Sequence, residues 1–362
     1  MPQRVAFPPL EGISVAAEGY LRALGLEVVP VPPSSRRTLD LGITHSPEML
    51  CVPCKLLFGN YLEAAERGAD SIIMLGGPGT CRLGYSAALH ASLLSQLGYE
   101  CRVYTLDLYR MQRDLFRLTR ELSEGRSFLD LVEPVRLVLG LLRLVDGIEQ
   151  RSLAKRPVAL VPAAVERARS QALDRVRAIR DTHQLQAEED QIVALLDAVI
   201  CDPTRPALTL GLVGDAYTML TPFLNLNLER ELGRLGVVVQ RWFRLDVRLV
   251  PPLPRPLRRD RGTQAREAGK QYLGRDVGGF ARATVGEAAL MAQDEVDGLV
   301  HVTPFNCTPE IVAQSALVAL QRDHGMPVLN LSFDEQTGRG GVLTRIEAFV
   351  DMLWAQRRAG RP

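Results

Sequence analysis

The sequence predicts an α/β protein that contains two doubly wound parallel sheets with a helical segment between them. Apolar strand-like runs alternate with helix-like runs over the first hundred residues, and the alternation returns after about residue 204. Such short strand–helix periods are typical of parallel βαβ units. Between the two regions, Leu and charged residues recur at helical spacing and β-branched runs are scarce. We therefore expect an N-terminal α/β domain at 1–106, a mainly helical segment at 107–203 and a C-terminal α/β domain at 204–362.

The N-terminal elements are predicted from apolar runs that proline and glycine punctuate. A proline in the first turn favours a helix start, and a glycine beyond the last turn favours a helix end. Extended segments are expected at Arg4–Phe7, Glu27–Val31, Leu39–Ile43, Ser71–Leu75 and Cys101–Leu106. Helices are expected at Ile13–Leu24, Pro53–Arg67 and Tyr85–Leu97. The mostly apolar run Ser71–Leu75 suits a flavodoxin-like or Rossmann-like strand that is buried on both faces.

The later elements follow from the same signals. Within the helical segment, prolines favour a loop at Ser152–Val161. Strands are expected at Ala207–Val213, Val237–Trp242, Leu299–Val302 and Pro327–Ser332, and helices at Phe223–Leu235, Pro309–Gln321 and Val342–Arg358. Pro251–Pro256 is too rich in proline for a central strand, so we expect a stiff connector there.

The composition narrows the class of protein without assigning a function. The 362 residues are 46% hydrophobic, which suffices for more than one core, and the net charge is +1. A balanced charge gives no general attraction to nucleic acid, and the basic stretch at 255–270 lacks interleaved aromatic residues. No apolar run is long enough for a membrane span and no secretory signal is visible, so we expect a cytoplasmic protein. A Gly-Lys-Ser/Thr phosphate loop and a G-x-S-x-G elbow are both absent, so neither ATP binding nor serine hydrolase chemistry is supported.

Three of the six cysteines stand at predicted strand-to-helix crossings. They are Cys51, Cys81 and Cys307, and Cys54 completes a C-x-x-C pair with the first. Ligands of open α/β sheets bind at the carboxyl ends of the strands, and helix N-termini stabilise a thiolate or an anionic iron–sulfur cluster. From spacing alone, a shared metal or cluster site and a set of small buried side chains both stay open. Zinc is a rival metal, because Cys51 and Cys54 have the spacing of half a zinc knuckle.

Charged residues near these cysteines are further candidates. Glu48 and His45 lie within six residues of Cys51 and suit acid–base roles, with helix capping around Glu48 as an equal alternative. Lys55 and Arg82 each follow a candidate ligand and suit the compensation of cluster charge. The alternative for both is an ordinary solvated cation.

Two glycines and two other cysteines are the remaining residues considered for the site. Gly77 and Gly79 precede Cys81 and would let backbone N–H groups approach a cluster closely. Cys101 lies in a predicted strand and Cys201 follows an apolar helix end, so we expect both to be ordinary buried side chains.

The segments around the candidate residues carry recognisable motifs. They are His45–Glu48, Cys51–Gly59, Gly76–Tyr85, Pro304–Glu310 and Leu331–Gly338, together with Gly214-Asp215 and Tyr217. As a set, they resemble the family of 2-hydroxyacyl-CoA dehydratase and benzoyl-CoA reductase cluster subunits, in the branch labelled CoA-enzyme-activase-related. The resemblance is weakest in the helical middle and at 244–295.

The resemblance implies a [4Fe–4S] cluster that three cysteines hold between two α/β domains. Carried over, the ligands are Cys51, Cys81 and Cys307. Cys54 departs from the family pattern and has three open readings. The first is a fourth ligand, which would turn a catalytic site into an electron relay. The second is a ligand that helps to hold a double-cubane cluster, and the third is a bystander thiol.

The same resemblance implies a redox enzyme subunit of anaerobic metabolism. Such a subunit accepts low-potential electrons from an ATP-dependent activator iron–sulfur protein, forms a homodimer or a heterodimer with a related subunit, and reduces or dehydrates a small substrate such as a CoA thioester. The alternatives are a non-catalytic cluster carrier and a zinc-stabilised structural protein.

Overall fold

The computed structural model describes residues 3–76, 81–107, 111–123, 127, 129–242, 261–294 and 296–360. The chain divides into two units. As far as their residues are described, the first unit comprises Met1–Glu149 and Arg169–Leu196, and the second comprises Gln150–Ala168, Asp197–Phe243 and Leu253–Pro362. Each unit contains a four-stranded, all-parallel sheet, which confirms the predicted fold class of two doubly wound sheets. The three-part division at 1–106, 107–203 and 204–362 stays a prediction.

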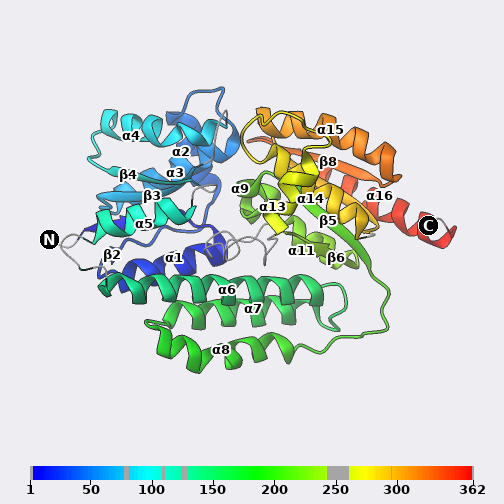
Figure 1. Cartoon of the computed structure of the whole chain (residues 1–362), viewed down its shortest axis with the longest axis horizontal. Helices are drawn as coiled ribbons and strands as arrows, with labels where there is room; N and C mark the ends of the chain where they lie inside the picture. Colours follow the sequence, from blue (N-terminus) through cyan, green and yellow to red (C-terminus); the bar gives the residue numbers. More distant parts are fainter. Residues whose placement is uncertain are drawn as a thin grey trace. The chain divides into compact units, whose positions relative to one another are not determined.

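The sheet of the first unit has the strand order β2-β1-β3-β4. Its strands are β1 (Arg4–Ala6), β2 (Glu27–Val28), β3 (Ser71–Gly76) and β4 (Arg102–Asp107). The helices between them are α1 (Glu11–Ala23), α2 (Arg36–His45), α3 (Val52–Glu66) and α4 (Ser86–Gln96). Figure 1 shows α2, α3 and α4 on one side of this sheet and α1 on the other. Because β1 pairs with both β2 and β3, the crossing direction reverses between β1 and β3, and ligands of such sheets bind outside those strand ends.

The extended run expected at Leu39–Ile43 is wrong, because these residues lie inside helix α2. A capping box starts this helix: Ser35 Oγ accepts from the Thr38 backbone N–H, and Thr38 Oγ1 accepts from the Ser35 N–H at 3.1 Å. Leu39 and Gly42 are buried. A local cap together with packing on the neighbouring helix therefore outweighs the extended preference of this short run.

Glycines bring α2 and α3 into backbone contact. A Cβ on Gly42 would stand 1.9 Å from the Lys55 carbonyl oxygen, and a Cβ on Gly59 would stand 1.8 Å from the Thr38 carbonyl oxygen. No side chain fits at either position without moving a helix. The start of α3, where the C-x-x-C pair lies, is therefore fixed against α2.

The middle of the chain is helical, as predicted. Its helices are α5 (Met111–Leu122), α6 (Val132–Lys155), α7 (Pro162–Ala178) and α8 (Thr182–Asp197). The loop expected at Ser152–Val161 begins later, because α6 continues to Lys155. Within the first unit, the Arg169 guanidinium on α7 pairs with Glu149 on α6 at 2.7 Å and with Glu11 on α1 at 2.6 Å. None of the described helices is long and apolar enough to cross a membrane.

The sheet of the second unit has the order β6-β5-β7-β8, which repeats the topology of the first. Its strands are β5 (Leu208–Gly214), β6 (Val237–Gln240), β7 (Gly298–Pro304) and β8 (Val328–Phe333). Its helices include α9 (Ala216–Met219), α10 (Pro222–Asn225), α11 (Leu228–Arg234), α13 (Arg261–Gly269), α14 (Ala281–Gln293), α15 (Thr308–His324) and α16 (Arg339–Arg358). The sequence did not predict α14.

The helix expected at Phe223–Leu235 is interrupted. Leu226 and Asn227 have φ angles of 58° and 61°, so the chain forms α10 and then α11. The connector predicted at Pro251–Pro256 lies outside the described residues, and so does the basic stretch before Arg261. From Arg261 onward, that stretch forms helix α13.

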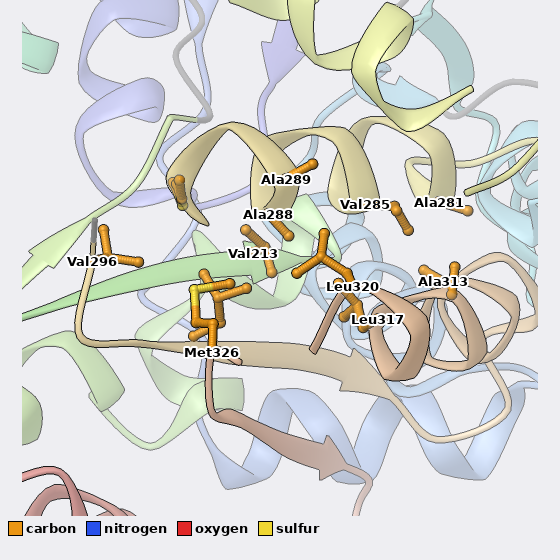
Figure 2. Close-up of a cluster of buried hydrophobic side chains, with 13 residues drawn as sticks. Val213, Ala281, Val285, Ala288, Ala289, Val296, Ala313, Leu317, Leu320 and Met326 are labelled. Atoms are coloured by element: carbon orange, nitrogen blue, oxygen red, sulfur yellow. The ribbon is translucent and has the colours of Figure 1, made fainter. Parts of the chain in front are cut away.

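A hydrophobic core holds α14 and α15 on the sheet of the second unit (Figure 2). Val213 of β5 and Leu299 of β7 meet Val285 of α14 and Leu317 of α15 in this cluster. Many of its α14 side chains are alanines, which allow the helix to approach closely. The packing holds the middle of α15, the helix that begins directly after Cys307.

We expect Gly42→Ala to lower the free energy of unfolding by about 1–3 kcal/mol, because the added methyl overpacks a backbone contact. The matched control is Gly340→Ala in α16, where no atom lies within 4 Å of the added Cβ. That change should stabilise by up to about 1 kcal/mol, since alanine favours helix over glycine. Denaturant unfolding measures both, and equal effects at the two positions would contradict the close contact.

Candidate functional site

Each of the three predicted ligand cysteines is the residue immediately before a helix. Cys51 precedes α3, Cys307 precedes α15, and Cys81 precedes the short 3-10 helix Arg82–Gly84 that leads into α4. All three have extended backbone angles and are buried, with exposed fractions of 6%, 9% and 8%. The expected strand-to-helix crossings are therefore confirmed for Cys81 and Cys307, and Cys51 lies at a helix-to-helix crossing instead.

Cys51 and Cys54 form a contacting pair of thiols. Their Sγ atoms are 3.6 Å apart, and Cys54 has no exposed surface. The first turn of α3 produces this contact, because the backbone N–H groups of Cys54 and Lys55 both donate to the Cys51 carbonyl, at 3.0 and 3.3 Å. Residues three apart on a helix lie side by side.

The other two candidate thiols are far from this pair in the sequence. Cys81 belongs to the first unit and Cys307 to the second. Among the described residues, no group of three or more His, Cys, Asp or Glu side chains is arranged as a metal site. The ligand set of Cys51, Cys81 and Cys307 therefore stays a prediction. Cys101 and Cys201 are half-buried, and each thiol donates to a backbone carbonyl, of Ala69 at 3.0 Å and of Val199 at 3.5 Å.

The acid–base candidates lie between α2 and α3. His45 is the last residue of α2 and is half-buried, whereas Glu48 is exposed in the turn that follows. A helix start around Glu48 is wrong, since Ser46 is the residue after α2 and α3 begins at Val52. The acid–base roles of both residues stay predictions.

The charge-compensation candidates differ in burial. Lys55 is only 7% exposed and lies one helical turn after Cys51, so an ordinary solvated cation is the wrong description of it. Arg82 is half-buried at the start of the 3-10 helix. Gly77 and Gly79 lie outside the described residues.

A buried polar network lies one turn after Cys307. The Glu310 carboxylate accepts from Thr284 Oγ1 at 3.1 Å, and its other oxygen is 3.0 Å from His301 Nε2. On the far side of the ring, His301 Nδ1 is 2.9 Å from Asn330 Oδ1. His301 and Glu310 are both essentially inaccessible. The network joins β7, β8, α14 and α15, and it anchors the helix turn that carries Cys307.

Asp215 lies at the carboxyl end of the neighbouring strand, β5. Its carboxylate accepts from the Thr218 N–H at 2.8 Å and from Thr218 Oγ1 at 2.7 Å, and so caps α9. Burial raises the pKa of Asp215 to about 6, the Thr218 hydrogen bonds oppose this rise, and the charge of Glu310 adds to it. Gly214 has a φ angle of 132°, and a Cβ there would meet the Val302 carbonyl oxygen at 2.0 Å.

The two sheets place corresponding features at corresponding positions. Cys81 follows β3 and Cys307 follows β7, and these are equivalent strands in the two sheet orders. Asp215 and Cys307 follow the two adjacent strands between which the second sheet reverses its crossing direction. The described part of the second unit therefore has acidic and thiol groups at the position where open α/β sheets bind ligands.

Sequence reasoning missed His301, His90 and the role of Glu310. A single histidine inside the apolar strand β7 was the available signal for His301, because a fully buried polar residue requires a partner. His90 of α4 packs against Phe58 and Tyr61 of α3, with ring centroids at 5.1 and 5.5 Å. Burial lowers the pKa of His90 to about 4, so this ring is neutral at pH 7.

The second unit is thus a doubly wound α/β fold with a thiol and buried carboxyl groups at the carboxyl ends of its two central strands. Residues 262–353, which run from α13 into α16 and include Cys307, match the family model described as 2-hydroxyglutaryl-CoA dehydratase, D-component. This match supports the 2-hydroxyacyl-CoA dehydratase family, which is the family that the motifs predict, and it includes the motifs Pro304–Glu310 and Leu331–Gly338. Among curated proteins, no significant match was found.

We expect Glu310→Ala to lower the free energy of unfolding by about 3 kcal/mol, because it leaves buried His301 and Thr284 without their shared partner. Glu310→Gln keeps the shape and one acceptor, so its effect should be smaller. Glu347→Ala removes an exposed carboxylate of α16 and should change stability by at most about 0.5 kcal/mol. Denaturant unfolding ranks the three variants, and equal values for Glu310→Ala and Glu347→Ala would contradict the network.

Asp215 should make stability fall as the pH rises through the weakly acidic range. Its pKa is about 6 when folded against 3.8 as a reference, so between these values the folded state holds the proton that the unfolded state has released. The stabilising effect is complete below about pH 4 and is lost as the pH rises toward 6, at a total of about 3 kcal/mol. The free energy of unfolding of the wild type and of Asp215→Asn should be measured from pH 4 to 7. As the pH rises, the wild type should lose stability relative to the variant. A pH-independent difference would contradict this assignment.

Proposed function

We propose that this chain is an iron–sulfur subunit of the 2-hydroxyacyl-CoA dehydratase type, in which Cys51, Cys81 and Cys307 hold a [4Fe–4S] cluster. It accepts low-potential electrons from an ATP-dependent activator and acts in the reduction or dehydration of a small substrate, such as a CoA thioester. The observation that carries the proposal is that all three cysteines are buried residues at helix starts. The family match over residues 262–353 supports the same class.

The donor groups fit an anionic cluster chemically. A [4Fe–4S] cluster bound by thiolates supplies one-electron transfer at low potential. The first backbone N–H groups of a helix have no intrahelical acceptor, and they favour negative charge beside them. Cys51 and Cys307 have this position on helices of 15 and 17 residues. The Lys55 ammonium lies one turn from Cys51 and offsets part of the negative charge.

Candidates for proton transfer lie in both units. His45 and Glu48 are the candidates of the first unit. To these we add Asp215 of the second unit, because a carboxyl group with a pKa of about 6 holds or releases a proton near neutral pH. Asp215 also follows β5 at the ligand-binding edge of its sheet.

Partners and location follow from the same proposal. We propose a cytoplasmic protein that works with an activator iron–sulfur protein and forms a dimer, either with itself or with a related subunit. The non-catalytic alternative is a cluster carrier or electron relay. A double-cubane cluster is the alternative cofactor.

One observation favours a second candidate, a zinc-stabilised structural protein. Two thiolates on one tetrahedral zinc ion, with Zn–S bonds of about 2.3 Å, lie about 3.8 Å apart. The Cys51 and Cys54 sulfurs are 3.6 Å apart and match this separation. Bound metal in the purified protein therefore separates the two candidates.

Protein purified without oxygen should be brown and contain about four irons and four sulfides per chain. Single serine variants of Cys51, Cys81 and Cys307 should each lose most of this iron and the electron paramagnetic resonance signal of the reduced cluster. Cys101→Ser and Cys201→Ser are matched controls, because their half-buried thiols bond to backbone carbonyls, and both should keep the iron. Colourless protein with one zinc per chain would sink the cluster proposal.

A further inference from the structure

We propose that Cys51 and Cys54 are a dithiol–disulfide exchange site that reacts with small disulfides of the glutathione class. This site goes beyond the proposed cluster, in which Cys51 alone of the pair is a ligand. It also assigns a function to Cys54, which the family pattern does not account for.

The first turn of α3 places the Cys51 and Cys54 sulfurs close enough to form a disulfide bond. They are in contact at 3.6 Å, whereas a disulfide bond is about 2.05 Å long, so closure requires only small rotations of two side chains. The turn that carries them is already formed by hydrogen bonds to the Cys51 carbonyl. Pro53 lies between the two cysteines in the first turn. A C-x-x-C pair at a helix N-terminus is an arrangement that supports thiol–disulfide exchange.

Burial assigns different roles to the two thiols. Cys51 retains 6% of its surface exposed, whereas Cys54 has none. Cys51 is therefore the more accessible residue of the pair, and we assign the first contact with an incoming disulfide to it. Cys51 is the attacking thiol and Cys54 is the resolving thiol.

The reaction balances with the small disulfide as the oxidant. The Cys51 thiolate attacks one sulfur of the disulfide RSSR, the S–S bond breaks, and the first RSH leaves with one proton. Cys54 then attacks the Cys51 sulfur of the mixed disulfide and releases the second RSH. The two protein thiols lose two electrons and two protons, and one RSSR becomes two RSH.

Formation of this disulfide has a consequence that rests on the proposed function. A cysteine in a disulfide has no thiolate to offer to iron, so oxidation of the pair withdraws Cys51 from the ligand set. The oxidised chain should therefore take up no cluster until a dithiol reductant restores Cys51.

Peptide mapping tests the exchange site directly on the full chain, prepared without iron. Trypsin releases Thr38–Lys55, which contains Cys51 and Cys54 and no other cysteine. After incubation with oxidised glutathione, acid quenching and blocking of free thiols, this peptide should be unblocked and two hydrogens lighter than its reduced form. Cys54→Ser should instead retain one glutathione on Cys51, and Cys54→Ala provides the same test if the serine variant fails to fold.

The controls separate this inference from the proposed function. Cys101→Ser and Cys201→Ser keep the pair and should form the disulfide as the wild type does. A Thr38–Lys55 peptide with both thiols blocked after oxidation would overturn the exchange site, even if the protein binds iron. A disulfide in a protein that never binds iron would leave the exchange site standing and remove the cluster. Reconstitution with iron and sulfide before and after reduction then measures whether the disulfide excludes the cluster.

Discussion

Parallel pairing of β5 with both β6 and β7, and of β1 with both β2 and β3, is the constraint that decides where the candidate site residues lie. In each sheet, the connections that follow the two central strands cross over opposite faces of the sheet. The loops after these two strands therefore diverge at one edge. Cys307 and Asp215 follow the two strands that border this point in the second unit. Their place is therefore a result of topology, and the local sequence determines only which side chains stand there.

The buried polar network around His301 holds the helix turn that follows Cys307. A thiol at a helix start is positioned only as well as the first helical turn itself. Glu310 ties that turn to a strand and to a neighbouring helix through His301 and Thr284, while apolar packing of α14 and α15 fixes the rest of the helix. Buried hydrogen bonds of this kind specify one arrangement of elements where apolar contacts alone would accept several. The second unit thus combines an apolar core with buried hydrogen bonds that hold the helix turn next to Cys307.

The sequence allowed the fold class and most elements to be predicted, because buried parallel strands and their helices have strong local signals. Leu39–Ile43 was misassigned because the run is short, and the capping box at Ser35 and the contact with α3 decided its conformation. The interruption at Leu226 and Asn227 depends on two left-handed residues that carry no glycine signal. For the site, the N-terminal position of the cysteines on helices could be predicted from Pro53 and Pro309. The partnership of His301 with Glu310 could not, because a histidine inside an apolar strand indicates only that a partner is needed, and the partner belongs to a different element.

The glycine contact between α2 and α3 also determines how the C-x-x-C pair responds to chemistry. Gly42 and Gly59 leave no space between the two backbones, so the helix that carries the thiols has little freedom to slide or tilt. Any change at the sulfurs is then taken up by side-chain rotation within the first turn. A spectroscopic label attached at Cys51 would accordingly report the immediate surroundings of the sulfur, and it would be a poor sensor of movement in the helix beneath.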